Sequence, residues 1–267
     1  MLSKRVISAI LGIIFLIIMV LWGSLPFFGL VIIAALIAIY EYNKILEMKS
    51  NNQLLLSVFT LFILMITFLN IKEAISFPWP FLILSILFLL ALYHILKTDQ
   101  QDFLSVFGYN IIGILYIAGG LSFFILLREF SIAPFDSTKA LWLVLLATWA
   151  GDTGAYFIGN KFGKTSLSAK SPNKSVEGAI GGILFAMLVV SIYTTILGAF
   201  SSYWLLYALI IAVIAMIGDL FESSIKRFAN VKDSANLIPG HGGILDRIDS
   251  LIFSAPFTYY FLFFILL

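Results

Sequence analysis

Acidic side chains lie inside or beside long apolar runs in the C-terminal half of this 267-residue chain. Asp246 and Asp249 are three residues apart, a spacing that places both carboxylates on one face of a helix. Asp152 lies in an earlier apolar run. Helical spacing places a further group on one face of another helix: Asp219, Glu222, Ser223 and Lys226. A carboxylate at membrane depth costs about 2.5–3.5 kcal/mol on insertion scales, so each acid needs a partner or a function.

The chemistry open to these residues is that of a hard cation and a phosphate. The chain has no Cys and two His, so its acids can offer an oxygen-only site, which suits Mg²⁺. Magnesium shares its coordination sphere with substrate phosphates, and the basic residues Lys226 and Arg227 lie beside the acids. The combination indicates phosphoryl or nucleotidyl transfer at a membrane surface. The alternative is salt bridging between helices, in which the same acids neutralise Lys226 or Arg247.

Two loops between these runs are rich in glycine. One loop places three glycines around His241, with backbone N–H groups that could face an anion: Gly240, Gly242 and Gly243. His241 is either a ligand of a phosphate or base, or a solvated loop residue. In the preceding loop, Ser171 before Pro172 predicts a helix N-cap followed by the first helical position, which would point a helix N-terminus at the phosphates. Neither loop matches a Walker loop or a dinucleotide fingerprint.

The composition indicates which elements must position these groups. Hydrophobic residues make up 61% of the chain, charged residues make up 11%, and the mean hydropathy is +1.08, which excludes an ordinary water-soluble domain. The absence of Cys excludes a disulfide framework, and a net charge of +2 gives no reason to expect nucleic acid. We therefore predict an all-α polytopic membrane protein with about nine transmembrane helices. Sufficiently long apolar runs cover roughly residues 6–22, 27–43, 54–70, 77–96, 104–127, 138–159, 176–199, 203–225 and 247–266.

The Lys and Arg residues predict how these spans are oriented. Nine spans place 13 of the 16 on the side of the N-terminus and leave 3 on the other side. By the positive-inside rule, the N-terminus and the candidate site are cytoplasmic and the C-terminus is outside. No internal repeat is found, which argues against an inverted-repeat transporter. We expect one transmembrane domain over 1–267, with apolar packing and lipid-facing helices in 1–130 and the catalytic helices and loops in 138–267.

Several other residues have structural interpretations. Glu41, near the end of the second span, is predicted to be an interfacial acid, and His94 an interfacial histidine. Paired glycines at 119–120 and 181–182 predict close helix packing.

The stretch from Ser223 to Asp249 resembles the signature of phosphatidate cytidylyltransferases, also called CDP-diacylglycerol synthases. The matching positions follow the family pattern without a gap: Ser223, Lys226, Arg227, Lys232, Asp233, Ala235, His241, Gly242, Gly243, Asp246, Arg247 and Asp249. A second block upstream is also similar to the family: Asp152, Gly159, Gly163, Lys164, Ser171, Lys174, Glu177 and Gly178. Asn173 and Ser175 depart from that block. The resemblance covers roughly residues 145–255.

The resemblance implies a bacterial inner-membrane enzyme of phospholipid biosynthesis. Such enzymes join phosphatidate to CTP, giving CDP-diacylglycerol and pyrophosphate, and require Mg²⁺. The implied step is in-line attack of a phosphatidate oxygen on the α-phosphorus of CTP, catalysed by positioning and charge neutralisation. The implied partners are CTP, phosphatidate and membrane lipids, without nucleic acid. The resemblance also suggests a homodimer and a second, monovalent cation such as K⁺.

Roles for the matched residues follow from the resemblance as expectations. The catalytic group comprises Asp219, Lys226, Arg227, Asp246 and Asp249. Its three acids are the expected metal ligands, with Asp249 either a third ligand or the group that orients Arg247. Basic residues would hold the phosphates of CTP and the phosphatidate headgroup: Lys164, Lys174, Lys226 and Arg227. His241, Gly242 and Gly243 would shape the nucleotide pocket. The other expected substrate-binding residues are Asp152, Ser171, Glu177, Ser223, Lys232, Asp233 and Arg247.

Two alternatives stand beside this interpretation. A CTP-dependent polyprenol or phytol kinase would transfer the γ-phosphate to an alcohol and release CDP. An ion or proton transporter would also explain acids in membrane spans. It would not explain three glycines, a histidine and a basic cluster in one cytoplasmic loop.

Overall fold

Long apolar helices form most of the chain. The computed structural model describes residues 2–48, 50–136, 138–168, 171–231, 234–235 and 242–266. Its helices are α1 (Leu2–Trp22), α2 (Ser24–Ile45), α3 (Ser50–Ile71), α4 (Trp79–Lys97), α5 (Phe103–Gly113), the π-helical η1 (Ile114–Gly119), α6 (Gly120–Arg128), α7 (Lys139–Phe162), α8 (Val176–Ile196), α9 (Tyr203–Phe228) and α10 (Leu245–Leu266). A short hairpin of β1 (Ser166–Ser168) and β2 (Ser171–Ser175) precedes α8.

The helices confirm the predicted membrane-protein class. Within the described residues, eight helical segments are long and apolar enough to cross a membrane, and α5, η1 and α6 count as one of them, Phe103–Arg128. In α1 the apolar part found by the same criteria is the shorter Ile10–Trp22. Each of the nine predicted spans coincides with a helix, with ends that agree to about one helical turn. The chain is therefore an integral membrane protein built from helices.

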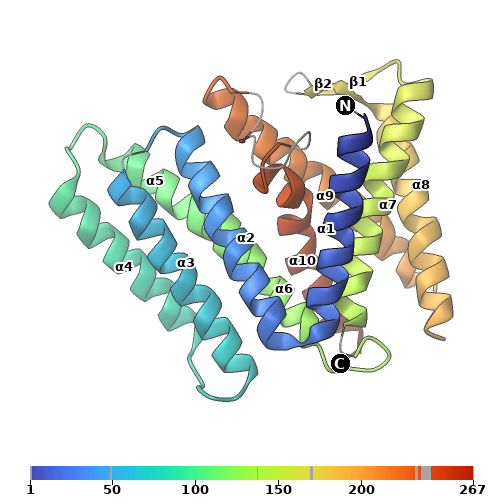
Figure 1. The fold of residues 1–267 in the computed structure, drawn as a ribbon, viewed down its shortest axis with the longest axis horizontal. Helices are drawn as coiled ribbons and strands as arrows, with labels where there is room; N and C mark the ends of the chain where they lie inside the picture. Colours follow the sequence, from blue (N-terminus) through green and yellow to red (C-terminus); the bar gives the residue numbers. More distant parts are fainter. Residues whose placement is uncertain are drawn as a thin grey trace.

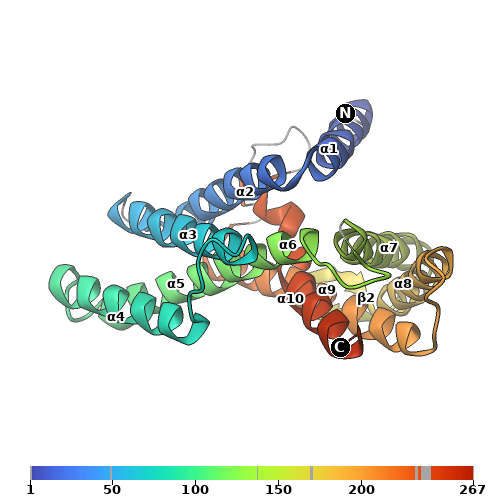
Figure 2. The ribbon, with the colours of Figure 1, turned by 90° about the horizontal axis from the view of Figure 1, so that it is seen from below.

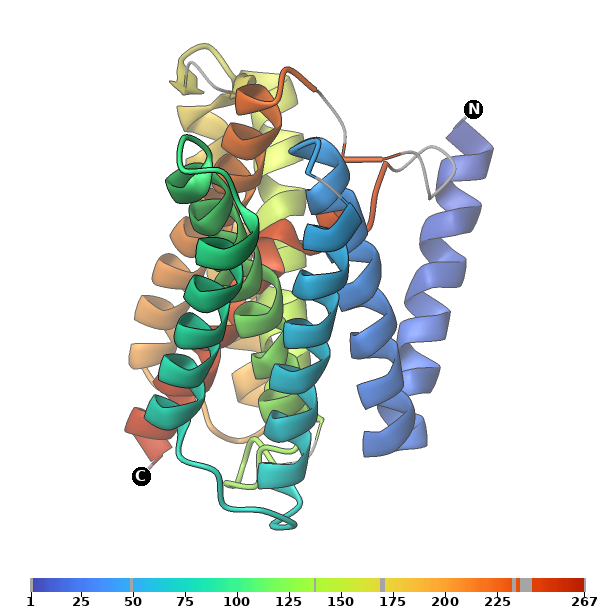
Figure 3. The same cartoon turned by 90° about the vertical axis from the view of Figure 1, so that its left-hand side faces the viewer.

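The bundle places the two ends of the chain at opposite ends of its helices. Figure 1 shows the N-terminus at the same end as the β1–β2 hairpin, the end of α9 and the start of α10, whereas the C-terminus lies at the other end. This is the arrangement that the nine predicted spans require. Figures 2 and 3 show α1 at the edge of the bundle beside α2. Buried apolar side chains of α2, α3, η1, α6, α7, α9 and α10 form most of the core of the bundle.

Glycines bring α7 and α8 into close contact. A Cβ atom on Gly154 of α7 would lie 2.6 Å from the carbonyl oxygen of Gly181, and one on Gly182 of α8 would lie 2.7 Å from that of Gly151. The predicted packing role of residues 181–182 is confirmed. Gly120 packs in the same way, since its Cβ would lie 2.8 Å from the carbonyl oxygen of Ile252 in α10. Residue 119 meets only its own π-helical segment, so the predicted packing role belongs to Gly120.

The start of α8 differs from the prediction. Ser171 does not cap a helix, because it pairs with Ser168 in the hairpin and the chain stays extended as far as Ser175. Ser175 has an extended backbone and its hydroxyl accepts the N–H of Gly178 at 3.0 Å, which makes it the N-cap of α8. Pairing with β1 satisfies the backbone of β2 and so delays the helix by one turn.

His94 also differs from the prediction. It is fully buried instead of interfacial, with Nδ1 2.8 Å from the hydroxyl of Thr98 and Nε2 2.6 Å from the side-chain amide of Asn110. The hydrogen bond to Asn110 joins the end of α4 to α5, whereas the one to Thr98 stays within the end of α4. A histidine within an apolar helix here marks a helix–helix contact.

We expect Gly154→Ala to destabilise the protein, because the added methyl would overlap the carbonyl oxygen of Gly181 and the side chain of Phe185 in α8, and overpacking costs about 1–3 kcal/mol. Gly29→Ala in α2 is the matched control, since a Cβ there meets nothing within 4 Å. Alanine is favoured over glycine in a helix by about 1 kcal/mol, so the control should be neutral or stabilising. Thermal unfolding in detergent, followed by Trp fluorescence, measures both. A melting temperature for Gly154→Ala at or above that of Gly29→Ala would refute the packing role.

Candidate active site

Acids from three helices lie close together near the end of the bundle at which the N-terminus of the chain lies. Asp249 of α10 interacts electrostatically with Asp219 of α9 and with Asp152 of α7. A Cβ on Gly218 would lie only 2.7 Å from the backbone oxygen of Asp249, so the backbones of α9 and α10 touch beside these two acids. Asp249 is 8% exposed, whereas Asp152 is exposed. The structure therefore brings together the acids that the sequence placed in separate helices.

Asp219 is ion-paired with Lys174 of the hairpin strand β2. Its other carboxylate oxygen accepts a hydrogen bond of 3.3 Å from Ser223, one turn later in α9. Both members of the ion pair are partly exposed, with 28% of the Lys174 side chain and 33% of the Asp219 side chain accessible. The pair holds the hairpin against α9 while leaving both charges within reach of a ligand from water.

Asp246 lies deeper and has more partners. Its Oδ1 accepts a hydrogen bond of 2.6 Å from Lys226 of α9. Its Oδ2 accepts the backbone N–H groups of Ser234 at 3.2 Å and Gly243 at 2.9 Å, and lies 2.8 Å from the Ser234 hydroxyl. Lys226 is also ion-paired with Glu222, which is 1% exposed. Asp246 of α10 and Lys226 of α9 thus form the salt bridge between helices that the sequence analysis gave as an alternative to a metal site.

The predicted face of α9 is confirmed by these contacts. Ser223 bonds to Asp219, and Glu222 pairs with Lys226, each four residues apart. Arg227 is exposed, and its guanidinium donates a hydrogen bond of 3.2 Å to the carbonyl of Val231.

Gly242 and Gly243 approach carboxylates of the protein itself. Gly242 has a φ of +82°, and a Cβ there would lie 2.6 Å from Oδ2 of Asp246. A Cβ on Gly243 would overlap the Ser234 hydroxyl and the carboxylate of Glu41. The backbone N–H of Gly243 donates to Asp246, so the anion that this glycine binds here is a carboxylate of the protein itself. Their role in a nucleotide pocket stays a prediction.

Glu41 was predicted to be interfacial, and that prediction is wrong. Its side chain is fully buried at the end of α2 and accepts hydrogen bonds from the segment that begins α10. Local spacing could not reveal this contact, because the partners lie about 200 residues further along the chain.

Tyr116 of η1 is another residue that sequence reasoning missed. It is 5% exposed and packs against Phe221 of α9 and Phe253 of α10, with ring centroids 5.1 and 5.7 Å away. Its hydroxyl has no hydrogen-bond partner among the described residues, and it interacts electrostatically with the acids of α9 and α10. The one signal is its place in a π-helical segment, a feature frequent at functional sites.

The loop after α7 is held by Glu177. Its Oε2 accepts the backbone N–H groups of Lys164 at 3.1 Å and Thr165 at 3.2 Å. Ser171 lies in β2, and Arg247 is exposed and interacts electrostatically with Asp152. Three further predicted site residues lie outside the described residues: Lys232, Asp233 and His241.

The donor chemistry of the acids fits Mg²⁺. Asp152, Asp219 and Asp249 interact across three helices and offer carboxylate oxygens, the ligands that this ion prefers. No group of three or more acidic or histidine side chains in the described part of the chain is close enough together to hold an ion as it stands. Lysine ammonium groups lie against two of the predicted ligands, Asp219 and Asp246. A divalent ion would therefore compete with lysine for Asp219.

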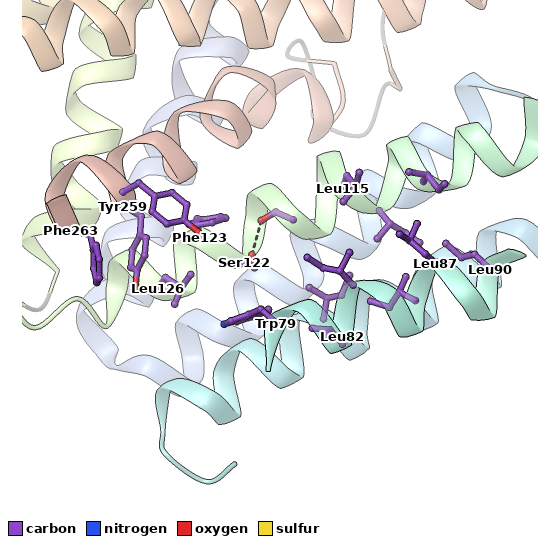
Figure 4. Close-up of a pocket in the computed structure, with 17 residues that line it drawn as sticks. Trp79, Leu82, Leu87, Leu90, Leu115, Ser122, Phe123, Leu126, Tyr259 and Phe263 are labelled. Carbon is purple, nitrogen blue, oxygen red and sulfur yellow. Dashed lines mark hydrogen bonds between the residues drawn. The ribbon is translucent and has the colours of Figure 1, made fainter. Parts of the chain in front are cut away.

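An apolar cavity of about 470 Å³ has none of these acids in its lining (Figure 4). It is lined by residues of α3, α4, α10 and the continuous segment of α5, η1 and α6, and Trp79, Phe123 and Tyr259 are among the lining residues. None of the described residues that line it is charged. The hydroxyl of Ser122 donates a hydrogen bond to the carbonyl of residue 119, one turn earlier in the same helical segment. The cavity offers no charged group to bind a phosphate, so the acid cluster is the candidate site.

Comparisons with known proteins agree with the chemistry of this cluster. Residues 3–265 match the model of the cytidylyltransferase family. A phosphatidate cytidylyltransferase of Thermotoga maritima is 36% identical over 242 residues, which cover 86% of this chain and 85% of the relative. One of Bacillus subtilis is 34% identical over 268 residues, which cover 97% of each chain. On this match over almost its whole length, the chain belongs to the cytidylyltransferase family.

Proposed function

We propose that this enzyme condenses CTP with phosphatidate, giving CDP-diacylglycerol and pyrophosphate in phospholipid biosynthesis. Membership of the family makes it a nucleotidyltransferase, and its relatives over most of the chain are named phosphatidate cytidylyltransferases. The observation that carries the proposal is the meeting of three acids with Lys174 and Lys226 at one end of a membrane bundle. The family and the names of these relatives support neither alternative, a lipid kinase or a transporter.

The site end of the bundle is proposed to face the cytoplasm, in a bacterial inner membrane. The N-terminus, the hairpin and the start of α10 share that end (Figure 1), and the excess of Lys and Arg predicts it to be the inner one. CTP is a cytosolic nucleotide, and phosphatidate presents its headgroup at the surface of the same leaflet. Both substrates would then meet where the acids lie.

Positioning and charge neutralisation are proposed to drive the transfer. A phosphatidate oxygen attacks the α-phosphorus of CTP and forms the new P–O bond, while the bond from the α-phosphorus to the bridging oxygen breaks and pyrophosphate leaves with the electron pair. No covalent intermediate on the protein is needed. Mg²⁺, when bound, would neutralise charge on the reacting phosphates. A homodimer and a second cation such as K⁺ stay predictions.

Asp219 and Asp249 are the proposed principal metal ligands, with Asp152 beside them. Asp219 would exchange its lysine for the ion, and Lys174, once released, would pair with the phosphates of CTP. Asp246 was expected to be a ligand as well. Because both of its oxygens already accept hydrogen bonds, it would join the ion only if Lys226 moved away.

We expect Asp219→Ala and Asp249→Ala each to lower kcat by about 100- to 1000-fold, as does the loss of a group that stabilises charge in the transition state. Asp136→Ala is the control, because this exposed acid pairs with Lys139 at the other end of the bundle. The assay supplies CTP, phosphatidate and Mg²⁺ and measures pyrophosphate. Wild-type rates in both site variants would disprove the ligand assignment, and release of CDP in place of pyrophosphate would indicate the kinase.

Lys174→Met should raise the KM for CTP by about 10- to 100-fold, since a hydrogen bond to a charged group contributes about 1.5–3 kcal/mol. Lys161→Met is the control, because this exposed lysine at the end of α7 contacts the ring of Phe162 instead of an acid. Steady-state kinetics at varied CTP measures the change. A purely structural role for Lys174 would give a different result. The KM of Lys174→Met for CTP would then stay at the wild-type value, and its fold would be destabilised until Asp219→Asn was added to the same chain.

The proposed orientation can be tested with single cysteines, because the chain has none of its own. Ala74→Cys lies between α3 and α4, and Asp99→Cys lies between α4 and α5, at the opposite end of the bundle. Both positions are exposed. In intact spheroplasts, a membrane-impermeant maleimide should label Ala74→Cys alone. Labelling of Asp99→Cys alone would invert the topology.

A further inference from the structure

Glu41 lies at the end of α2 and makes all its described hydrogen bonds with one distant segment. Its Oε1 accepts the backbone N–H of Ile244 at 2.9 Å, and its Oε2 accepts that of Leu245 at 2.8 Å. The hydroxyl of Ser234 donates to Oε2 at 3.0 Å. The side chain is 0% exposed, so substrate cannot reach it without rearrangement.

The contacts make Glu41 a cap for α10. The first N–H groups of a helix have no partner within the helix, and its N-terminal end carries a partial positive charge. Leu245 is the first residue of α10, and Ile244 precedes it. A carboxylate from α2 therefore satisfies these donors and fixes the direction in which α10 begins. Asp246 and Asp249 follow within the first turns of that helix.

Ser234 links this cap to the acid cluster. Its hydroxyl lies 3.0 Å from Oε2 of Glu41 and 2.8 Å from Oδ2 of Asp246. One hydroxyl proton can serve only one of these oxygens at a time, so the two carboxylates share a donor. Gly243 fits between Ser234 and Glu41 only because it has no side chain. The segment that enters α10 is thus packed around two carboxylates, one from α2 and one from α10.

Stability alone gives little reason for an acid at position 41. Burying a carboxylate carries a desolvation cost, and replacing a buried ionic or polar group with a well-packed apolar one is often neutral or stabilising. What an apolar residue could not provide is directional hydrogen bonding to the start of α10. The contribution of Glu41 is therefore best sought in the geometry of the acids that follow.

We propose that Glu41 is a positioning residue for the nucleotidyl transfer, which it serves by fixing the first turn of α10 and with it the carboxylates of Asp246 and Asp249. The proposal rests on the proposed function. It assigns a role in the reaction to α2, a helix of the apolar N-terminal half.

The test compares Glu41→Gln with Asn43→Ala. Gln fills the same space but turns an N–H donor toward N–H groups. Asn43 is the matched control, because it is buried in the same turn of α2 and its amide bonds to the carbonyl of Met48. For Glu41→Gln we expect kcat to fall by about 10- to 100-fold and the Mg²⁺ concentration for half-maximal rate to rise about 10-fold, as for other groups that orient metal ligands. Asn43→Ala should match the wild type in both.

A second measurement needs no substrate or metal. Hydrogen exchange followed by mass spectrometry should show faster exchange in peptides covering Ile244–Asp249 of Glu41→Gln, and unchanged exchange there in Asn43→Ala. Wild-type kcat together with wild-type exchange in Glu41→Gln would overturn the proposal. So would an equal loss of kcat in Asn43→Ala. If the wild type made no CDP-diacylglycerol, the proposed function would fail, while the exchange result would still decide whether Glu41 orders α10.

Ser234→Ala covers the case in which Glu41→Gln does not fold. It removes one of the three donors to Glu41 and leaves both backbone donors in place. We expect a smaller fall in kcat, of about 2- to 10-fold, with exchange raised in the same peptides, because one hydrogen bond is worth about 0.5–1.5 kcal/mol. The proposal is refuted if Glu41→Gln does not fold and Ser234→Ala keeps the wild-type kcat and the wild-type hydrogen exchange. Glu41 would then have a role in folding only.

Discussion

The cost of removing a carboxylate from water governs the arrangement of this end of the bundle. An ionised acid away from water must be paired or hydrogen-bonded. Asp246 meets this requirement with Lys226 and two backbone N–H groups, Glu41 with two other backbone N–H groups, and Asp219 with Lys174. Each pairing also joins two elements: α9 to α10, α2 to α10, and the hairpin to α9. The compensation of buried charge is therefore what assembles the site.

The acids differ in the kind of partner that compensates their charge. Backbone N–H groups cannot leave without unfolding the local chain, so an acid that they hold serves as a scaffold. A lysine ammonium group can swing away, so its acid can accept another cation. Glu41 is of the first kind, and Asp219, with its partly exposed lysine, is of the second. Asp246 is of both kinds, with Lys226 on one oxygen and the loop on the other. This division follows from partner identity and exposure alone.

The sequence predicted the features that depend on local spacing. Hydrocarbon thickness sets the length of an apolar run, so the nine spans could be located from composition. The 3.6-residue period aligned Asp219 with Ser223 and Glu222 with Lys226, and both contacts are present. The cap of α8 was misplaced, because the hairpin pairing that keeps Ser171 extended joins residues on two strands and leaves no mark in helical spacing.

Contacts between distant parts of the chain were beyond such reasoning. The energetic cost of an acid in an apolar helix could signal that Glu41 has a partner, but not that the partner is the start of α10. For Tyr116 even that signal is absent, because a phenol is common in membrane helices and its hydroxyl carries no charge. The apolar N-terminal half, predicted to pack and face lipid, thus places buried polar groups of α2 and η1 beside the start of α10 and the acids of α9 and α10. Where most of a helix is apolar, a single carboxylate is enough to tie it to the start of a distant helix, as Glu41 ties α2 to α10.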